Sequence, residues 1–169
     1  APLGTACTEH HIQMLWQVID TPTFCLDGDT AGKRAMARVA KMVLPMLASG
    51  KSVQFVLLPE GQDPDDLIRA EGKQAIQTAI EKAVPLSEAL VAVARSGNTL
   101  KTPEQWAAFE DELMQLASQI KNTTVQDYYR QAFREKLRNL RFNAGKANTK
   151  QKQGFSSFKK VEVKADRDS

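Results

Sequence analysis

The chain has 169 residues, enough for one domain or one and a half, and its 42% hydrophobic content is sufficient for a real core. No apolar run approaches the roughly 20 residues that a membrane-spanning helix needs, so we expect no membrane partner. Residues 146–169 contain seven Lys or Arg and three Asp or Glu, a net charge of +4, which leaves −1 of the total +3 for residues 1–145. The sequence therefore predicts a balanced body with a basic tail.

The first predicted element is an amphipathic helix near the N-terminus, capped by Thr8. Its apolar positions are Ile12, Leu15, Trp16 and Ile19. On a helix, His10 and His11 point about 100° apart and are poorly placed to share a metal ion, so we expect them at the surface. Cys7 and Cys25 lack metal-binding or redox spacing. We interpret them as small buried residues of a reducing compartment, and expect no zinc in this segment.

A strand, a helix, a second strand and a further helix follow. Residues 21–27 form a short strand, and a helix extends from about Thr30 to Leu47. The β-branched run of residues 52–58 predicts the second strand, after which Asp63 caps a helix that begins at Pro64. A strand–helix–strand connection predicts a parallel pair with a right-handed crossover. Because two parallel strands make a very small sheet, we expect further strands from elsewhere or a larger domain.

From about Gly72 the pattern is helical throughout. Predicted helices cover residues 73–84, 86–96, 102–121 and 125–142. The apolar stripes of the last two are Trp106, Phe109, Leu113, Leu116 and Ile120, and Val125, Tyr129, Phe133, Leu137 and Leu140. We expect these two helices to pack as an antiparallel pair. From Asn143 the residues are polar without periodicity, which predicts disorder.

The stretch "FCLDGDTAGKRA" contains the first candidate site. It fails as a phosphate loop, because Gly28 and Gly32 are too close together and Arg34 follows Lys33 where Ser or Thr is needed. Asp27 and Asp29, two residues apart at a strand end, can instead face the same way and bind Mg²⁺ or Mn²⁺. The alternative is that Asp29 caps the next helix and Asp27 accepts hydrogen bonds from the turn.

A second acidic cluster follows the second strand. It consists of Asp63, Asp65 and Asp66. The carboxyl ends of parallel strands lie at the same edge of a sheet, so the two clusters can converge on one or two metal ions. The alternative is again a helix cap, since Asp63 before Pro64 would serve that purpose alone. Two acidic clusters on successive strand ends favour the metal site.

Two basic stripes lie on helices. They are Arg34, Arg38 and Lys41, and Arg130, Arg134, Arg138 and Arg141. Charged helix faces of this kind usually contact only solvent. Beside a metal–carboxylate site, they would suit a phosphodiester backbone bound without sequence readout.

Three segments, residues 1–16, 24–39 and 58–68, resemble in order and spacing the RNA polymerase region of the bacterial replicative DNA primase (DnaG type). The segments "PLSEAL" and "YYRQAFREKLRNL" resemble more loosely the helical subdomain that follows it. The resemblance implies an α/β Toprim fold with a small parallel sheet, then an all-α subdomain and a disordered basic tail. The corresponding boundaries are 1–83, 84–142 and 143–169.

In that family the two D-x-D aspartates, here Asp27 and Asp29, bind catalytic Mg²⁺ or Mn²⁺. The acidic segment after the next strand, here with Asp63 and Asp65, adds ligands, so two ions are implied. The implied activity is synthesis of short RNA primers from ribonucleoside triphosphates on a single-stranded DNA template, by metal-assisted nucleotidyl transfer. The implied location is the cytoplasm, at the nucleoid, with the replicative helicase bound through a domain outside this chain.

One departure concerns a glutamate that the family carries on an earlier Toprim strand. The chain begins after that point, so we expect it to be inactive alone. A non-catalytic helical module that binds a replication partner or DNA remains the alternative. Dehalogenase-like phosphatases also place D-x-D at a strand end, but they expect D-x-D-G-T, whereas "TAG" follows Asp29 here.

Overall fold

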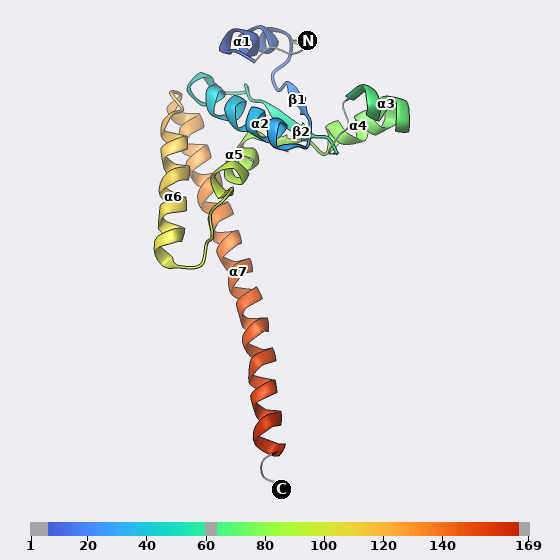
Figure 1. Cartoon of the computed structure of the whole chain (residues 1–169). Coiled ribbons are helices and arrows are strands. Elements are labelled where there is room, and N and C mark those ends of the chain that lie inside the picture. Colours follow the sequence, from blue (N-terminus) through green and yellow to red (C-terminus); the bar gives the residue numbers. More distant parts are fainter. Residues whose placement is uncertain (1–6, 60–63, 166–169) are drawn as a thin grey trace. The chain divides into compact units, whose positions relative to one another are not determined.

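The structure is a computed structural model. It describes the backbone of residues 7–59 and 64–165, with the side chains of residues 7–59, 65–70 and 72–144. The chain divides into two compact units, Ala1–Phe133 and Arg134–Ser169. The first unit holds a small sheet with helices around it, and the second is the continuation of the last helix (Figure 1).

The sheet has three strands in the order β1-β2-β3. Strands β1 (Thr23–Leu26) and β2 (Gln54–Leu57) are parallel, which confirms the predicted pair. Strand β3 (Val84–Pro85) pairs antiparallel with β2, so the sheet as a whole is mixed. Two residues cannot show a periodic pattern, and proline, which has no N–H to donate, is suited only to an edge strand.

Side chains of the sheet alternate between its two faces. Phe24 and Phe55 are partners in the parallel register, and their ring centroids lie 6.0 Å apart. On the other face, Val56 and Leu58 form a cluster with Leu67, against which half-buried alanines and Ile76 pack. Helices α3 (Pro64–Glu71) and α4 (Lys73–Glu81) supply the helical side of this cluster. The sheet is therefore packed on both faces, as a parallel pair requires.

Helix α2 (Thr30–Val43) connects the parallel strands and continues into the short 3₁₀ helix η1 (Leu44–Met46). The apolar stripe of this segment, formed by Met36, Val39, Val43 and Leu47, is buried. Helix α2 contacts both β1 and β2 and packs against helix α5 (Leu86–Arg95). It is the element that fixes the loop after β1.

Helix α1 (Glu9–Val18) forms where the sequence predicts it, with Thr8 as N-cap. His11 completes the cap, because its Nδ1 accepts a hydrogen bond from the Thr8 N–H at 3.2 Å. Of the predicted apolar stripe only Ile12 is fully buried, and Trp16 is half-buried with its indole N–H donating to the Ser52 carbonyl at 2.8 Å. The remaining apolar side chains of this region, Met14, Leu15, Val18 and Ile19, are exposed. The amphipathic pattern thus predicted the helix but not its burial.

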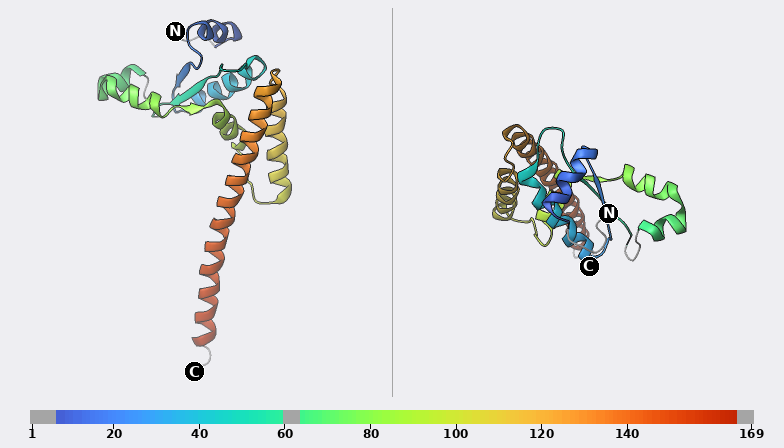
Figure 2. Two further views of the ribbon diagram at one scale, coloured as in Figure 1. Left: turned by 180° about the vertical axis from the view of Figure 1, so that it is seen from behind. Right: turned by 90° about the horizontal axis from the view of Figure 1, so that it is seen from above.

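The helical part consists of α5, α6 (Pro103–Ser118) and the first turns of α7 (Thr123–Ala165). Within the first unit, α6 and the beginning of α7, up to Phe133, lie side by side in both sets of views (Figures 1 and 2), as the sequence predicts. Most of their predicted stripe is buried: Phe109, Leu113, Leu116, Ile120, Phe133 and Leu137. The Tyr129 and Phe133 rings make an edge contact at 5.7 Å.

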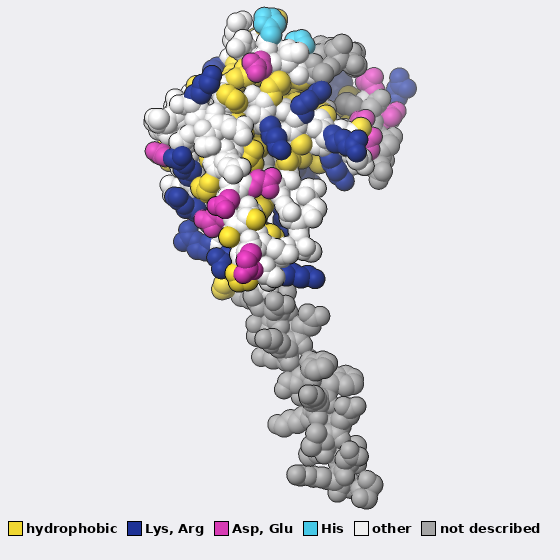
Figure 3. All heavy atoms as spheres, turned by 60° about the vertical axis from the view of Figure 1, so that its left-hand side comes forward, with side chains coloured by type: hydrophobic (Ala, Val, Ile, Leu, Met, Phe, Trp, Pro, Cys, Tyr) yellow, Lys and Arg dark blue, Asp and Glu magenta, His cyan; other side chains and the backbone are white. Residues whose placement is uncertain are grey.

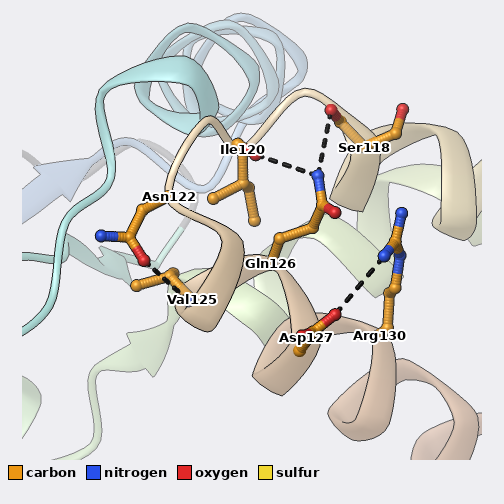
Figure 4. Close-up of polar contacts among 7 residues, drawn as sticks. All are labelled: Ser118, Ile120, Asn122, Val125, Gln126, Asp127 and Arg130. Carbon is orange, nitrogen blue, oxygen red and sulfur yellow. Dashed lines mark hydrogen bonds and ion pairs between the residues drawn. The ribbon is translucent and has the colours of Figure 1, made fainter.

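Side-chain amides hold the turn between α6 and α7 (Figure 4). The Gln126 side chain donates to the carbonyl oxygens of Ile120 at 3.0 Å and Ser118 at 3.3 Å, near the end of α6. The Asn122 carboxamide oxygen accepts from the Val125 N–H at 3.0 Å at the start of α7. These contacts satisfy backbone groups that helix ends leave without partners.

Helix α7 continues to Ala165, through most of the segment for which composition predicts a disordered linker. Residues 143–165 contain no proline and are rich in Lys, Ala and Gln, which favour or tolerate a helix. They also lack an apolar period that would pack against a partner helix. The boundaries at residues 83 and 142 remain predictions. No helix in the described part of the chain is both long and apolar enough to cross a membrane.

Candidate metal site

The two aspartates lie directly after β1, at the carboxyl end of the sheet. Asp27 is exposed and Asp29 is half-buried. Asp29 is the N-cap of α2, and its Oδ1 accepts a hydrogen bond from the Gly32 N–H at 2.7 Å. Asp29 therefore does cap α2, as the alternative interpretation expects. The cap uses one carboxylate oxygen of Asp29 and leaves Oδ2 for another ligand, so capping and metal binding are compatible at this residue.

Gly32 lets α2 start in close contact with the end of β1. A Cβ atom built at Gly32 would lie 1.8 Å from the Asp27 carbonyl oxygen and 2.8 Å from its carbonyl carbon. Any larger residue would thus push α2 away from the loop that carries both aspartates. From the sequence, Gly32 was considered only as part of a phosphate loop, which its spacing excluded. The signal that could have identified it is a glycine inside a helix, three residues after the second aspartate, where propensity disfavours glycine.

The structure describes only two of the three aspartates of the second acidic cluster. Asp63 lies outside the described residues, whereas Asp65 and Asp66 are exposed in the first turn of α3. Among the side chains that the structure describes, those of residues 7–59, 65–70 and 72–144, no three His, Cys, Asp or Glu come together as a metal-binding group. The structure places Asp27 and Asp29 in the loop directly after β1, and the convergence of Asp63 and Asp65 on them remains a prediction.

The residues present fit a divalent cation as part of a site. Asp27 and Asp29 offer hard carboxylate oxygens from two positions of one short loop, and Mg²⁺ and Mn²⁺ prefer such ligands. Mg²⁺ typically uses one or two protein carboxylates and keeps several waters. Two carboxylates therefore suffice to hold one ion beside a phosphate substrate, which would complete its coordination.

The basic stripe on α2 faces solvent. Arg34, Arg38 and Lys41 are all exposed, whereas the opposite side of the helix is buried in the core. Figure 3 shows one face of the molecule, on which Lys and Arg side chains stand out with hydrophobic side chains between them. Arg38 also acts on Cys7: partial burial raises the pKa of this thiol, and the Arg38 charge offsets part of that rise.

The basic stripe on α7 begins near the turn with α6. Arg130 is half-buried and forms an ion pair with Asp127 at 3.4 Å (Figure 4). Arg134 and Arg138 are exposed at successive four-residue steps along the same helix. Their spacing fits either a solvated face or a phosphodiester contact, as the sequence predicts.

Two family models match the chain. The Toprim-like model matches residues 1–68, and the model for the DnaB-helicase binding domain of primase matches residues 90–139. The second match covers most of α5, all of α6 and the first turns of α7. We expected helicase binding through a domain outside this chain, whereas this match lies within the chain.

Among curated proteins, the chain is 37% identical over 151 residues to a DNA primase from Rickettsia felis, covering 89% of the chain and 25% of that protein. It is 38% identical over 137 residues to the DNA primase of Escherichia coli K12, covering 81% of the chain and 24% of that protein. The chain thus spans about a quarter of the length of these relatives.

Solved structures share the fold. A DnaG catalytic core superposes with a TM-score of 0.72 at 37% identity, and the match covers 80% of this chain and 43% of that chain. The E. coli primase catalytic core gives the same score and coverage at 38% identity. A DnaG primase catalytic domain bound to ssDNA gives 0.71 at 36% identity, covering 79% and 43% of the two chains. The chain is therefore a homologue of a part of bacterial DNA primases. This part includes the Toprim-like region and the helical region that follows it.

Proposed function

We propose that this chain forms part of the active site of a DNA primase, an enzyme that joins ribonucleoside triphosphates into short RNA primers on single-stranded DNA. The observation that carries the proposal is the pair Asp27 and Asp29 at the carboxyl end of β1, in a fold shared with solved primase catalytic cores. In open α/β sheets this edge is where ligands bind. An enzyme with these substrates works in the bacterial cytoplasm, at the nucleoid.

Asp27 and Asp29 are the proposed ligands of Mg²⁺ or Mn²⁺, with Asp63 and Asp65 as further ligands from the next strand end. When bound, such ions activate the attacking 3′-oxygen and neutralise charge on the leaving pyrophosphate. Asp29 is held in a fixed orientation because its Oδ1 stays on the Gly32 N–H. Asp27, which is exposed, is free to adapt as a nucleotide arrives.

The decisive test separates metal binding from helix capping at Asp29. Asparagine caps a helix about as well as aspartate, but it lacks the charge that a hard cation prefers. In full-length protein, we expect Asp29→Asn to keep the thermal unfolding midpoint and to lower primer synthesis at least roughly 100-fold. Asp111→Asn, at an exposed carboxylate of α6 outside both acidic clusters, is the matched control. Wild-type primer synthesis by Asp29→Asn would leave the cap as the only role of this residue.

The 169-residue chain alone is proposed to be inactive. Two carboxylates leave most coordination positions of two metal ions to water, so the ions would be held weakly. Incubating the chain with ribonucleoside triphosphates, Mn²⁺ and a single-stranded template tests this directly. Primers made by the chain alone would show that it needs no further ligand.

The stripe of Arg34, Arg38 and Lys41 is proposed to contact the DNA backbone. Each phosphate contact on a single strand contributes about 0.7 to the slope of log K against log salt. Replacing all three residues by alanine is therefore expected to lower that slope by about 2 in full-length protein. Replacing Lys73, the first residue of α4, and Lys82, its C-cap, both exposed, should leave the slope unchanged. Equal slopes for the wild type and the triple variant would make the stripe a solvated face only.

A second proposed function, favoured by the match of residues 90–139, is contact with the replicative helicase. Tyr128 on α7 is 70% exposed within the matched region, and exposed aromatic side chains are frequent binding hot spots. We expect Tyr128→Ala to weaken helicase binding by full-length protein about tenfold, measured by biolayer interferometry. Met14→Ala, at an exposed apolar side chain of α1, is the control. Equal affinities of all three proteins would remove Tyr128 from the helicase contact.

A further inference from the structure

A pocket of about 530 Å³ lies between α2, the end of β2 and α5, and of its described lining residues only Arg34, in the proposed DNA-contacting stripe, has a role in the proposed function. Its volume is within the range of about 300–1,000 Å³ typical of ligand pockets. The apolar part of its lining is Met36, Ala37, Leu57, Ala92 and Val93. Leu57 is 38% exposed, although it belongs to a central strand. The pocket thus presents an apolar surface that an occupant would cover.

The rim of the pocket is cationic. Lys33 and Arg34 line it together with Thr30, and no Asp or Glu is among its described lining residues. Both cations are exposed, and neither forms an ion pair within the described part of the chain. The nearest acidic residue in sequence is Asp29, which already binds the Gly32 N–H. An occupant that complements this pocket therefore combines an apolar group with negative charge.

A protein segment fits this chemistry better than a nucleotide. A nucleobase in the apolar part would leave the polar atoms along its edge without partners, which is costly in a buried site. None of the pocket's described lining residues is aromatic, so they offer no ring on which a base could stack. A leucine or phenylalanine side chain has no such unsatisfied atoms, and two small alanines, Ala37 and Ala92, leave room for it.

The position of the pocket also favours a protein partner. Its α2 wall belongs to the region that matches the Toprim-like model, and Ala92, Val93 and Ser96 of its other wall belong to the region that matches the helicase-binding model. A segment seated there would contact both regions at once. We propose that this α2–α5 pocket is a docking site for a short acidic segment of a partner protein, which inserts one large apolar side chain and pairs its carboxylates with Lys33 and Arg34. The proposal does not depend on the metal site.

The test measures fluorescence polarisation of a labelled octapeptide, Gly-Asp-Glu-Leu-Phe-Asp-Glu-Gly, with full-length protein. Ala92→Phe fills the pocket and Lys33→Glu reverses its charge, and each is expected to weaken the peptide roughly tenfold or more. Ala107→Phe places the same side chain at an exposed position of α6, and Lys41→Glu reverses a charge of α2 outside the lining. These two controls should bind the peptide like the wild type. Circular dichroism of all four variants establishes that they are folded.

A second peptide, with both apolar residues replaced by alanine, shows whether the apolar side chain matters. We expect it to bind at least roughly tenfold more weakly than the first. Absence of binding to wild-type protein, equal binding of the two peptides, or equal weakening by Lys33→Glu and Lys41→Glu would each overturn the proposal. So would an Ala92→Phe variant that loses affinity for a single-stranded oligonucleotide and keeps its affinity for the peptide, because the pocket would then belong to nucleic acid.

Discussion

Replacing Gly32 by alanine should separate α2 from the end of β1. The new Cβ would lie 1.8 Å from the Asp27 carbonyl oxygen, whereas real Cβ atoms essentially never come within 3.0 Å of a neighbour. The helix or the strand end must therefore move by roughly 1.2 Å, the difference between the two distances. The neighbour is backbone, so no side-chain rotation relieves the contact. Overpacking of this kind costs up to about 3 kcal/mol.

Helix propensity acts in the opposite direction. Alanine in a helix is favoured over glycine by about 1 kcal/mol. The expected net loss for Gly32→Ala is thus about 2 kcal/mol in the free energy of unfolding, measured by urea denaturation followed by circular dichroism. Gly97→Ala is the comparison, because Gly97 has a φ of +82° with open space around it and should lose about 1 kcal/mol from backbone strain alone.

The same substitution should weaken the metal site. Moving α2 changes the position of Asp29 relative to Asp27, so Mn²⁺ affinity should fall for Gly32→Ala under conditions in which the protein is still folded. Gly97→Ala should bind Mn²⁺ like the wild type. A Gly32→Ala protein that is more stable than the wild type, as propensity alone predicts, would refute the close contact between α2 and β1.

Two further predictions concern the residues around Ser52, where α1 and α7 meet the start of β2. Burial raises the pKa of Tyr129, and a hydrogen bond with Ser52 lowers it only in part. The pKa of Tyr129 is therefore higher in the folded than in the unfolded protein. The contribution of the neutral Tyr129 to the free energy of unfolding is complete below about pH 10 and is lost as the pH rises through the folded pKa. In a Tyr128→Phe background, absorbance of the phenolate should show Tyr129 titrating above pH 10, and titration at or below pH 10 would contradict its burial. Lys51 donates to the Trp16 carbonyl and pairs with Asp20, each at 2.6 Å, so Lys51→Met should cost about 1 kcal/mol and speed amide hydrogen exchange in α1. Unchanged exchange in α1 would show that this ion pair does not hold the helix.

The first half of the fold was predictable because its signals are local. The caps at Thr8 and Asp29 and the stripe of α2 specify where these helices begin and which side they bury. The parallel pairing followed from the strand–helix–strand order. Strand β3 could not be predicted, since its two residues pair only because β2 offers a free edge in three dimensions.

The sequence predicts the two aspartates of the candidate site but not their surroundings. Two aspartates that lie two residues apart after a strand can direct their side chains the same way, whatever residues pack around them. The close approach of Gly32 to Asp27 depends on how α2 packs, which no local pattern contains. The α2–α5 pocket has lining residues that are distant in the sequence, from Thr30 to Ser96, and it exists only once the helices have packed.

Calorimetric titration of Mn²⁺ into full-length wild-type, Asp27→Asn and Asp29→Asn proteins tests whether the two aspartates hold a metal ion. Asparagine at position 29 preserves the cap on Gly32, so any change in heat reports on metal binding and not on the start of α2. If the two aspartates hold the ion, each variant loses the tight binding of the wild type while its unfolding midpoint stays the same. Wild-type Mn²⁺ affinity in both variants would contradict the metal site and leave the aspartates as residues of the turn.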